Sequence, residues 1–130
     1  MKLTNYYDPN FSSDKHLDIG CGYKIKNPYN SSNLYGVDIH SNKENLIKNY
    51  KKANLILDKI PFPDSFFSSV SAYDFIEHIP RQQFINEEMQ YTFINLMNEI
   101  YRVLKPNGLF FASTPVYPHP DTFVDPTHVN

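Results

Sequence analysis

The sequence of 130 residues lacks the features of several large protein classes. Its single cysteine, Cys21, allows no disulfide within the chain, and no Cys/His spacing typical of a metal site is present. We therefore expect a reducing, cytoplasmic location and no bound metal. No apolar run approaches the roughly 20 residues of a membrane-spanning helix, and the start of the chain has no signal-peptide pattern. These absences predict a soluble protein without a membrane partner.

An excess of positive charge is also missing, since 12 Lys and Arg residues face 14 Asp and Glu residues and the formal net charge is −2. Proteins that bind phosphate backbones carry dense basic patches, often interleaved with aromatic residues. We therefore expect no nucleic-acid partner. The length favours one domain over residues 1–130, large enough to bury roughly two-thirds of its unfolded surface.

What the sequence does contain is a series of short apolar runs that alternate with helix-like stretches, as in a parallel sheet with crossover connections. The expected strands cover residues 15–19, 33–38, 53–57, 70–75 and 109–114. Before them, the Tyr, Asn, Asp and Ser residues of 1–14 predict an irregular arm. After them, residues 115–130 predict a Pro-rich loop.

Two helices are expected between these strands. The capping-box pattern Ser41-Asn-Lys-Glu44 predicts a short helix over about 42–51. A longer helix is predicted by apolar residues that repeat at intervals of three to four from Phe93 to Leu104, and Lys105-Pro-Asn-Gly108 should end it. The connection 20–32 contains Pro28 and several Asn and Ser residues, so it can barely accommodate a helix.

The strongest functional signal is the run His16-Leu-Asp-Ile-Gly-Cys-Gly22, followed about one crossover later by Gly36-Val37-Asp38. Spaced glycines after a strand leave the backbone open to a ligand, and Asp38 can accept hydrogen bonds from two ribose hydroxyls. Taken singly, such glycines often only form turns and such an aspartate often caps a helix. Their order and spacing together favour a nucleotide-type cofactor site.

These motifs resemble those of the class I S-adenosylmethionine-dependent methyltransferases, in particular the small-molecule type with Leu-Asp-Ile-Gly-Cys-Gly. The resemblance covers about 15–114 and continues through Leu57-Asp58, Ile60-Pro-Phe-Pro-Asp-Ser-Phe-Phe67, Phe75-Ile-Glu-His-Ile-Pro80 and Glu99-Ile-Tyr-Arg-Val-Leu-Lys-Pro-Asn-Gly108. It implies an α/β fold with a Rossmann-like, doubly wound, mostly parallel five-stranded sheet in the order 3-2-1-4-5 and flanking helices. The C-terminal hairpin of the family has no counterpart, so we expect an exposed sheet edge through which a homodimer could form.

The resemblance also implies which residues hold the cofactor, S-adenosyl-L-methionine. Asp38 would bind the ribose, Asp58 the adenine amino group, and Tyr73 would lie near the sulfonium. The complete expected set is Asp18, Gly20, Cys21, Gly22, Asp38, Ile39, Asp58, Ala72 and Tyr73. One departure is Lys24, which stands where the family usually has a third glycine.

Methyl transfer to a hydroxyl needs a base, and histidine suits this role near neutral pH. The candidate catalytic residues are His78, Asp125 and His128. The tail Asp125-Pro-Thr-His128 resembles a segment of methyltransferases from sugar and surface-polysaccharide pathways. A purely structural role, packing under or bracing a loop, is the alternative for each of the three.

Three functions from different classes follow. The leading hypothesis is a methyltransferase acting on a small molecule, such as the hydroxyl of a sugar or surface-polysaccharide intermediate. A nicotinamide-dependent oxidoreductase is disfavoured because the third glycine of a dinucleotide site is absent. A non-catalytic scaffold that binds the cofactor weakly or not at all is favoured by Lys24 and by the absent strands.

Overall fold

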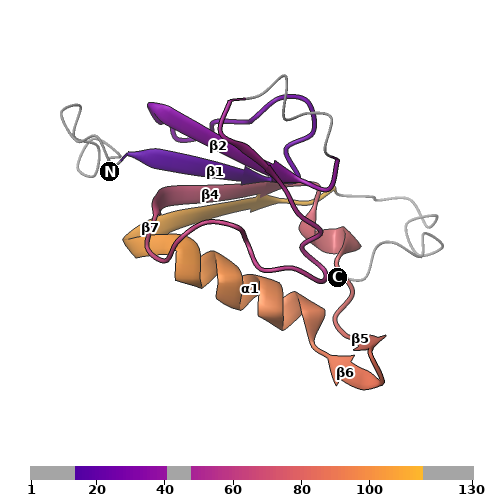
Figure 1. The fold of residues 1–130 in the computed structure, drawn as a ribbon. Helices are drawn as coiled ribbons and strands as arrows, with labels where there is room; N and C mark the ends of the chain where they lie inside the picture. The colour runs from indigo at the N-terminus through magenta and orange to yellow at the C-terminus, as the bar shows by residue number, and fades with distance from the viewer. Residues whose placement is uncertain (1–13, 41–47, 116–130) are drawn as a thin grey trace.

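The computed structural model describes residues 14–40 and 48–115, and the core of this part is a five-stranded sheet (Figure 1). Its strands are β1 (Lys15–Ile19), β2 (Asn33–Asp38), β3 (Tyr50–Lys52), β4 (Phe67–Tyr73) and β7 (Leu104–Ser113). They lie in the order β3-β2-β1-β4-β7, and all neighbours are parallel. Because β7 is the fifth strand of this sheet, the expected order and the Rossmann-like fold class are confirmed. The expected arm and Pro-rich loop fall almost entirely outside the described residues.

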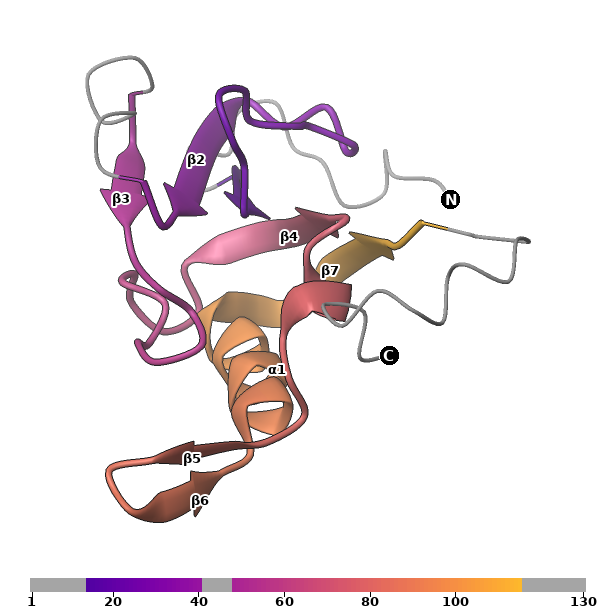
Figure 2. The same cartoon turned by 90° about the vertical axis from the view of Figure 1, so that its right-hand side faces the viewer.

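One face of the sheet packs against the helix α1 (Thr92–Val103), which lies beneath β4 and β7 in Figure 2. Leu96, Ile100 and Val103 are buried at helical spacing and join Leu17 and Val70 in one apolar core. The helix ends at Val103, before the Lys105-Pro-Asn-Gly108 segment, as the sequence predicts. Among the described residues, no helix has the length and apolar character needed to cross a membrane.

The opposite face of the sheet is polar at its centre. Successive residues of a strand point to opposite faces, so His16 and Asp18 lie on the face away from Leu17. Ser69 and Ser71 of β4 are paired with them in register. The connection 20–32 covers this face without forming a helix, as expected from its composition. Within the described residues, α1 is thus the one α-helix, and an irregular segment covers the face on which a second would lie.

The sequence-based boundaries around β3 are wrong. Residues 42–47 of the helix expected over 42–51 lie outside the described residues, but its last residues, Tyr50 and Lys51, are extended and pair with β2. Asn49 has a φ of 61°, a left-handed conformation that ends a helix. The strand expected over 53–57 is instead a turn. The Asp58 N–H donates to the Asn54 carbonyl at 2.7 Å, and the Asn54 N–H donates to Asp58 Oδ2 at 3.0 Å.

Two further boundaries differ. β4 covers Phe67–Tyr73 rather than 70–75, because Asp74 adopts a φ of 51° and a short 3₁₀ helix (Ile76–His78) follows. β7 begins at Leu104, earlier than the expected 109, and its pairing with β4 shifts register between Phe67 and Ser69. The hairpin of β5 (Gln83–Ile85) and β6 (Glu88–Gln90) was not predicted from the sequence, and it stands off from the sheet beyond the start of α1 (Figure 2).

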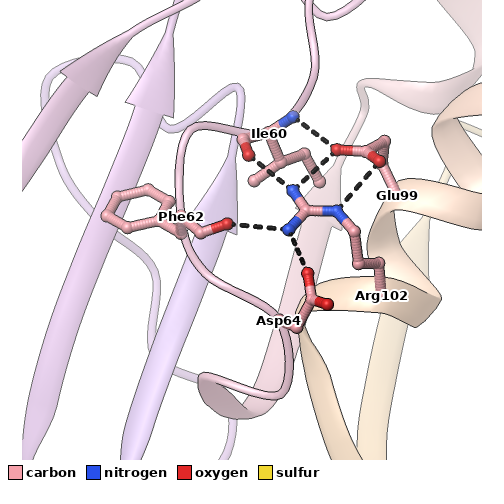
Figure 3. A network of polar contacts seen from close by, with 5 residues as sticks. All are labelled: Ile60, Phe62, Asp64, Glu99 and Arg102. Atoms are coloured by element: carbon pink, nitrogen blue, oxygen red, sulfur yellow. Dashed lines mark hydrogen bonds and ion pairs between the residues drawn. The ribbon is translucent and has the colours of Figure 1, made fainter.

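A guanidinium fixes α1 to the loop that precedes β4 (Figure 3). Arg102 donates hydrogen bonds to both carboxylate oxygens of Glu99, to the carbonyls of Ile60 and Phe62, and to Asp64, with distances of 2.7–3.0 Å. All five N–H groups of arginine are thereby satisfied. The Arg102 hydrogen bonds also hold the pKa of Glu99 below its usual value. These contacts hold the loop at residues 60–64 against the last turn of α1.

We expect Arg102→Ala to lower the free energy of unfolding by about 2 kcal/mol, because it leaves two backbone carbonyls and a half-buried carboxylate without their donor. Arg102→Lys should rescue little of this loss, since one ammonium cannot reach acceptors on both sides of the fork. Urea denaturation measures both values. Arg81→Ala, which removes an exposed arginine, is the control and should leave stability unchanged. An Arg102→Ala variant as stable as this control would contradict the account.

Candidate functional site

The turn after β1 requires glycine at its first position. Gly20 has a φ of 67°, and a Cβ placed on it would lie 2.5 Å from the Phe75 ring. Its N–H donates to the Val37 carbonyl at 2.8 Å, which brings the turn against the end of β2. Gly22 has a φ of 66°, with open space where a Cβ would be. The positive φ of Gly20 and the nearby Phe75 ring therefore both favour glycine at this position. Cys21, between the two glycines, is buried.

Asp38 joins the ends of β1 and β2. Its Oδ2 accepts the Gly22 N–H at 2.7 Å, and its Oδ1 accepts the Ile39 N–H at 2.6 Å. The Nδ1 atom of His40 lies 3.2 Å from the same Oδ1. The carboxyl ends of neighbouring parallel strands meet at one edge of a sheet, where α/β proteins bind ligands. The predicted residues Gly20, Gly22 and Asp38 are thus brought together at that edge.

A cavity of about 160 Å³ opens beside Asp38. Its walls include the apolar side chains of Val37, Ile39, Leu55 and Ile79, and His78 lies at its border. Ligand pockets for drug-sized molecules usually measure about 300–1,000 Å³, so this one encloses a group of nucleobase size. A longer ligand would have to continue outside it, along the Gly20–Gly22 turn. An apolar cavity next to a carboxylate that accepts hydrogen bonds fits an adenosine group.

Not every predicted cofactor residue borders this cavity. Asp58 lies outside it, in the turn after β3, where its Oδ2 accepts the Asn54 N–H at 3.0 Å. It borders a larger cleft of about 660 Å³ between this turn, the β5–β6 hairpin and α1. Asn54 and Leu55 border the cavity beside Asp38 instead, and sequence reasoning missed them because it extended the third strand past them.

The remaining predicted residues are dispersed. Ala72 is buried in β4, and Tyr73 follows it at the strand end, packed against Phe111. The Nε2 atom of His78 lies 3.6 Å from the buried carboxylate of Glu77. The other two candidate catalytic residues, Asp125 and His128, lie outside the described residues.

A buried chain of hydrogen bonds crosses the polar face of the sheet. The Ser71 hydroxyl donates to Asp18 Oδ1 at 2.7 Å, so it must accept from the Nε2–H of His16, 2.8 Å away. The Nδ1 of His16 then accepts from Ser69 at 2.7 Å. This pattern holds the imidazole neutral, and burial lowers the pKa of His16 to about 4. Burial also raises the pKa of the Asp18 carboxyl, since desolvation disfavours its charged form.

Asp18 does more than end this chain, because it also fixes the connection 20–32. Its Oδ2 accepts the backbone N–H of Lys26 at 2.9 Å and lies 3.9 Å from the Lys26 ammonium. The ammonium in turn lies 5.5 Å from the centroid of the Tyr73 ring. The Asp18 side chain is 0% exposed, so its carboxylate is covered by its own chain.

The sheet order defines a Rossmann-like α/β domain, and Asp38 and the apolar cavity lie at the edge where such domains bind ligands. Residues 17–112, more than half of the chain, match the family model described as a methyltransferase domain. The chain therefore belongs to the methyltransferase-domain family, and the resemblance drawn from the sequence is confirmed.

Several solved structures share this fold. The chain is similar to a SAM-dependent methyltransferase from Archaeoglobus fulgidus, with 22% identity, a TM-score of 0.53 and coverage of 98% of this chain and 58% of that one. It is also similar to the YcgJ protein from Bacillus subtilis, with 19% identity, a TM-score of 0.54 and coverage of 90% and 55%. A third similar structure is a putative methyltransferase from Bacillus halodurans, with 18% identity, a TM-score of 0.53 and coverage of 93% of this chain and 52% of that one.

The chain thus spans about half the length of these three solved proteins. No curated protein matches it. At these identities the solved structures establish the fold, and the family model carries the assignment.

The low pKa of His16 predicts that the folded protein loses stability as the pH is lowered. Because the pKa is about 4 in the folded state and 6.5 in the unfolded state, the unfolded chain binds this proton first as the pH is lowered. The contribution of His16 is complete above pH 6.5 and is lost as the pH falls towards 4. At roughly 1.4 kcal/mol per pKa unit, the loss reaches about 3 kcal/mol. Urea denaturation across this pH range measures it.

His16→Gln should flatten this pH dependence, because it removes the buried imidazole. Asp18 opposes the effect, because its raised pKa gives stability that is present at low pH and is lost as the pH rises through the folded-state value. Equal slopes for the wild type and His16→Gln would show that His16 titrates normally in the folded protein.

Proposed function

We propose that this chain binds S-adenosyl-L-methionine at the edge formed by β1 and β2 and takes part in methyl transfer to a small-molecule acceptor. Family membership implies this cofactor. The observation that carries the proposal is the position of Asp38, which is hydrogen-bonded to the glycine turn and borders a cavity of nucleobase size. The proposal places the ribose hydroxyls at Asp38 and the adenine between the apolar walls that include Ile39 and Leu55.

The bound cofactor supplies an activated methyl group, so the protein contributes mainly alignment of the acceptor. Gly20 brings the backbone close to the ligand, and the carboxylate of Asp38 complements the diol. An apolar cavity wall excludes water from one side of the adenine. None of these tasks requires an ionisable group to change its charge.

For the acceptor, we propose a hydroxyl-bearing small molecule such as a sugar or surface-polysaccharide intermediate. His78 borders the cavity and its side chain is 46% exposed, so it can reach both the site and solvent. A histidine in this position can take the proton of a hydroxyl near neutral pH. Asp125 and His128 remain candidates for the same task from the Pro-rich loop.

The location and assembly of the chain are also proposals. A cytoplasmic location accords with its single cysteine, Cys21. A homodimer through the outer side of β7 accords with the place of this strand at the end of the sheet order. An unpaired strand edge offers backbone donors and acceptors to another chain.

The oxidoreductase alternative loses further support in the structure. Tyr101 and Lys105 have the Tyr-x-x-x-Lys spacing found in some nicotinamide enzymes. However, Tyr101 lies on the solvent side of α1, 83% exposed, and neither residue borders the cavity beside Asp38. The spacing here reflects the helix end and places no catalytic pair at the site.

We expect Asp38→Ala to weaken binding of S-adenosylmethionine by at least about tenfold, because hydrogen bonds to a charged group contribute roughly 1.5–3 kcal/mol. Isothermal titration calorimetry with the full chain measures this, and circular dichroism checks that the variant folds. Glu88→Ala is the matched control. It removes the same charge from an exposed position of β6 outside the cavity and should retain wild-type affinity.

The same titrations separate the other hypotheses. A folded wild-type chain that binds neither S-adenosylmethionine nor its demethylated product would overturn the proposal in favour of a scaffold. Preferential binding of a nicotinamide dinucleotide would overturn it in favour of an oxidoreductase. If Asp58→Ala weakens binding and Asp38→Ala does not, the adenosine portion lies in the larger cleft beside α1.

A further inference from the structure

The surroundings of the Lys26 ammonium have the chemistry of a small cation-binding site. On one side lies Asp18 Oδ2, 3.9 Å away, and on another lies the ring of Tyr73, whose centroid is 5.5 Å away. A carboxylate and an aromatic face are two groups that proteins use to bind cations. The three residues come from β1, the end of β4 and the connection 20–32, so the chain assembles this arrangement from distant segments.

The arrangement lies at the edge of the sheet where we place the cofactor. Asp18 is in β1, next to the Gly20–Gly22 turn, and Tyr73 ends the neighbouring strand β4. The methionine portion of S-adenosylmethionine carries two positive groups, an ammonium and a sulfonium. The cavity beside Asp38 encloses only a group of nucleobase size, so these positive groups must lie outside it.

Resting on the proposed function, we propose that the Lys26 ammonium occupies the cation subsite of Asp18 and Tyr73 and competes with the positive methionine portion of the cofactor. The cofactor gains access to Asp18 only when the Lys26 side chain withdraws. Lys26 is therefore a residue that sets cofactor affinity and the preference between the charged cofactor and its uncharged-sulfur product.

The difference in exposure indicates which of the two partners can move. The Lys26 side chain is 43% exposed, whereas that of Asp18 is 0% exposed and is also hydrogen-bonded to Ser71. A lysine ammonium sits on a flexible four-carbon stem and is readily hydrated. The side chain can thus swing into solvent while the backbone N–H of Lys26 keeps its bond to Asp18. The subsite stays formed when its tethered cation leaves.

The opposite role, in which Lys26 binds the cofactor carboxylate, agrees less well with the geometry. The ammonium faces Asp18, so an anion beside it would lie close to a like charge. Competition and recruitment predict opposite signs for the effect of removing the lysine charge. One binding measurement therefore decides between them.

The test is isothermal titration calorimetry of the full chain with S-adenosylmethionine and with its demethylated product. We expect Lys26→Met to tighten binding of S-adenosylmethionine by roughly two- to fivefold, the range for removing one partner of a partly exposed charge pair. The gain should be smaller for the product, which lacks the sulfonium charge. Lys26→Gln is the second variant, and both keep the backbone bond to Asp18.

Lys48→Met is the matched control, because it removes the same charge from an exposed lysine outside the connection 20–32. It should change neither affinity by more than a small factor. If wild type binds and Lys26→Met binds equally or more weakly, the competition is overturned while the proposed function stands. If neither protein binds either compound although both fold, the proposed function itself fails. Equal gains for Lys48→Met and Lys26→Met would also overturn the proposal, since they indicate an effect of net charge alone.

Discussion

The hydrogen bond from the Gly22 N–H to Asp38 is the constraint on which the site depends. It links the turn after β1 to the end of β2, and the bond from Gly20 to Val37 makes the same link one step earlier. Together they fix the backbone of the turn beside the cavity without a helix behind it. The edge where we propose that the cofactor binds is therefore built mainly by contacts between two strand ends.

The two faces of the sheet differ in polarity and in how their buried side chains are stabilised. The face over α1 is apolar, and Leu17 and Val70 are fully buried there. The other face carries His16, Asp18 and their serine partners, each satisfied by a neighbour in the same chain of hydrogen bonds. Buried polar groups are tolerated only when they are paired in this way. Because these polar side chains are paired, a short, irregular connection can cover this face. Asp18 also accepts the backbone N–H of Lys26, which holds Lys26 beside it.

Sequence reasoning located the parallel strands, the long helix and the glycine turn, because each has a local signal. The apolar runs at β1 and β2, the spacing of Leu96 and Ile100, and the glycines at 20 and 22 are examples. It misplaced β3, because the apolar residues after Lys52 form a turn and line the cavity. Periodicity alone cannot distinguish such a short apolar run from a strand. The position of Lys26 over Asp18 could not be predicted, since it depends on how an irregular segment folds back over the sheet.

The guanidinium of Arg102 has a consequence for the order of events when the chain opens and closes. It joins backbone atoms 40 and 42 residues earlier in the sequence to the last turn of α1. The intervening chain contains β4, the β5–β6 hairpin and α1. The Arg102 contacts therefore connect the two ends of a long contiguous segment (Figure 3). Such segments tend to behave as one cooperative unit in hydrogen exchange. We therefore expect the amides of the loop at residues 60–64 and of the last turn of α1 to become exposed in one shared opening.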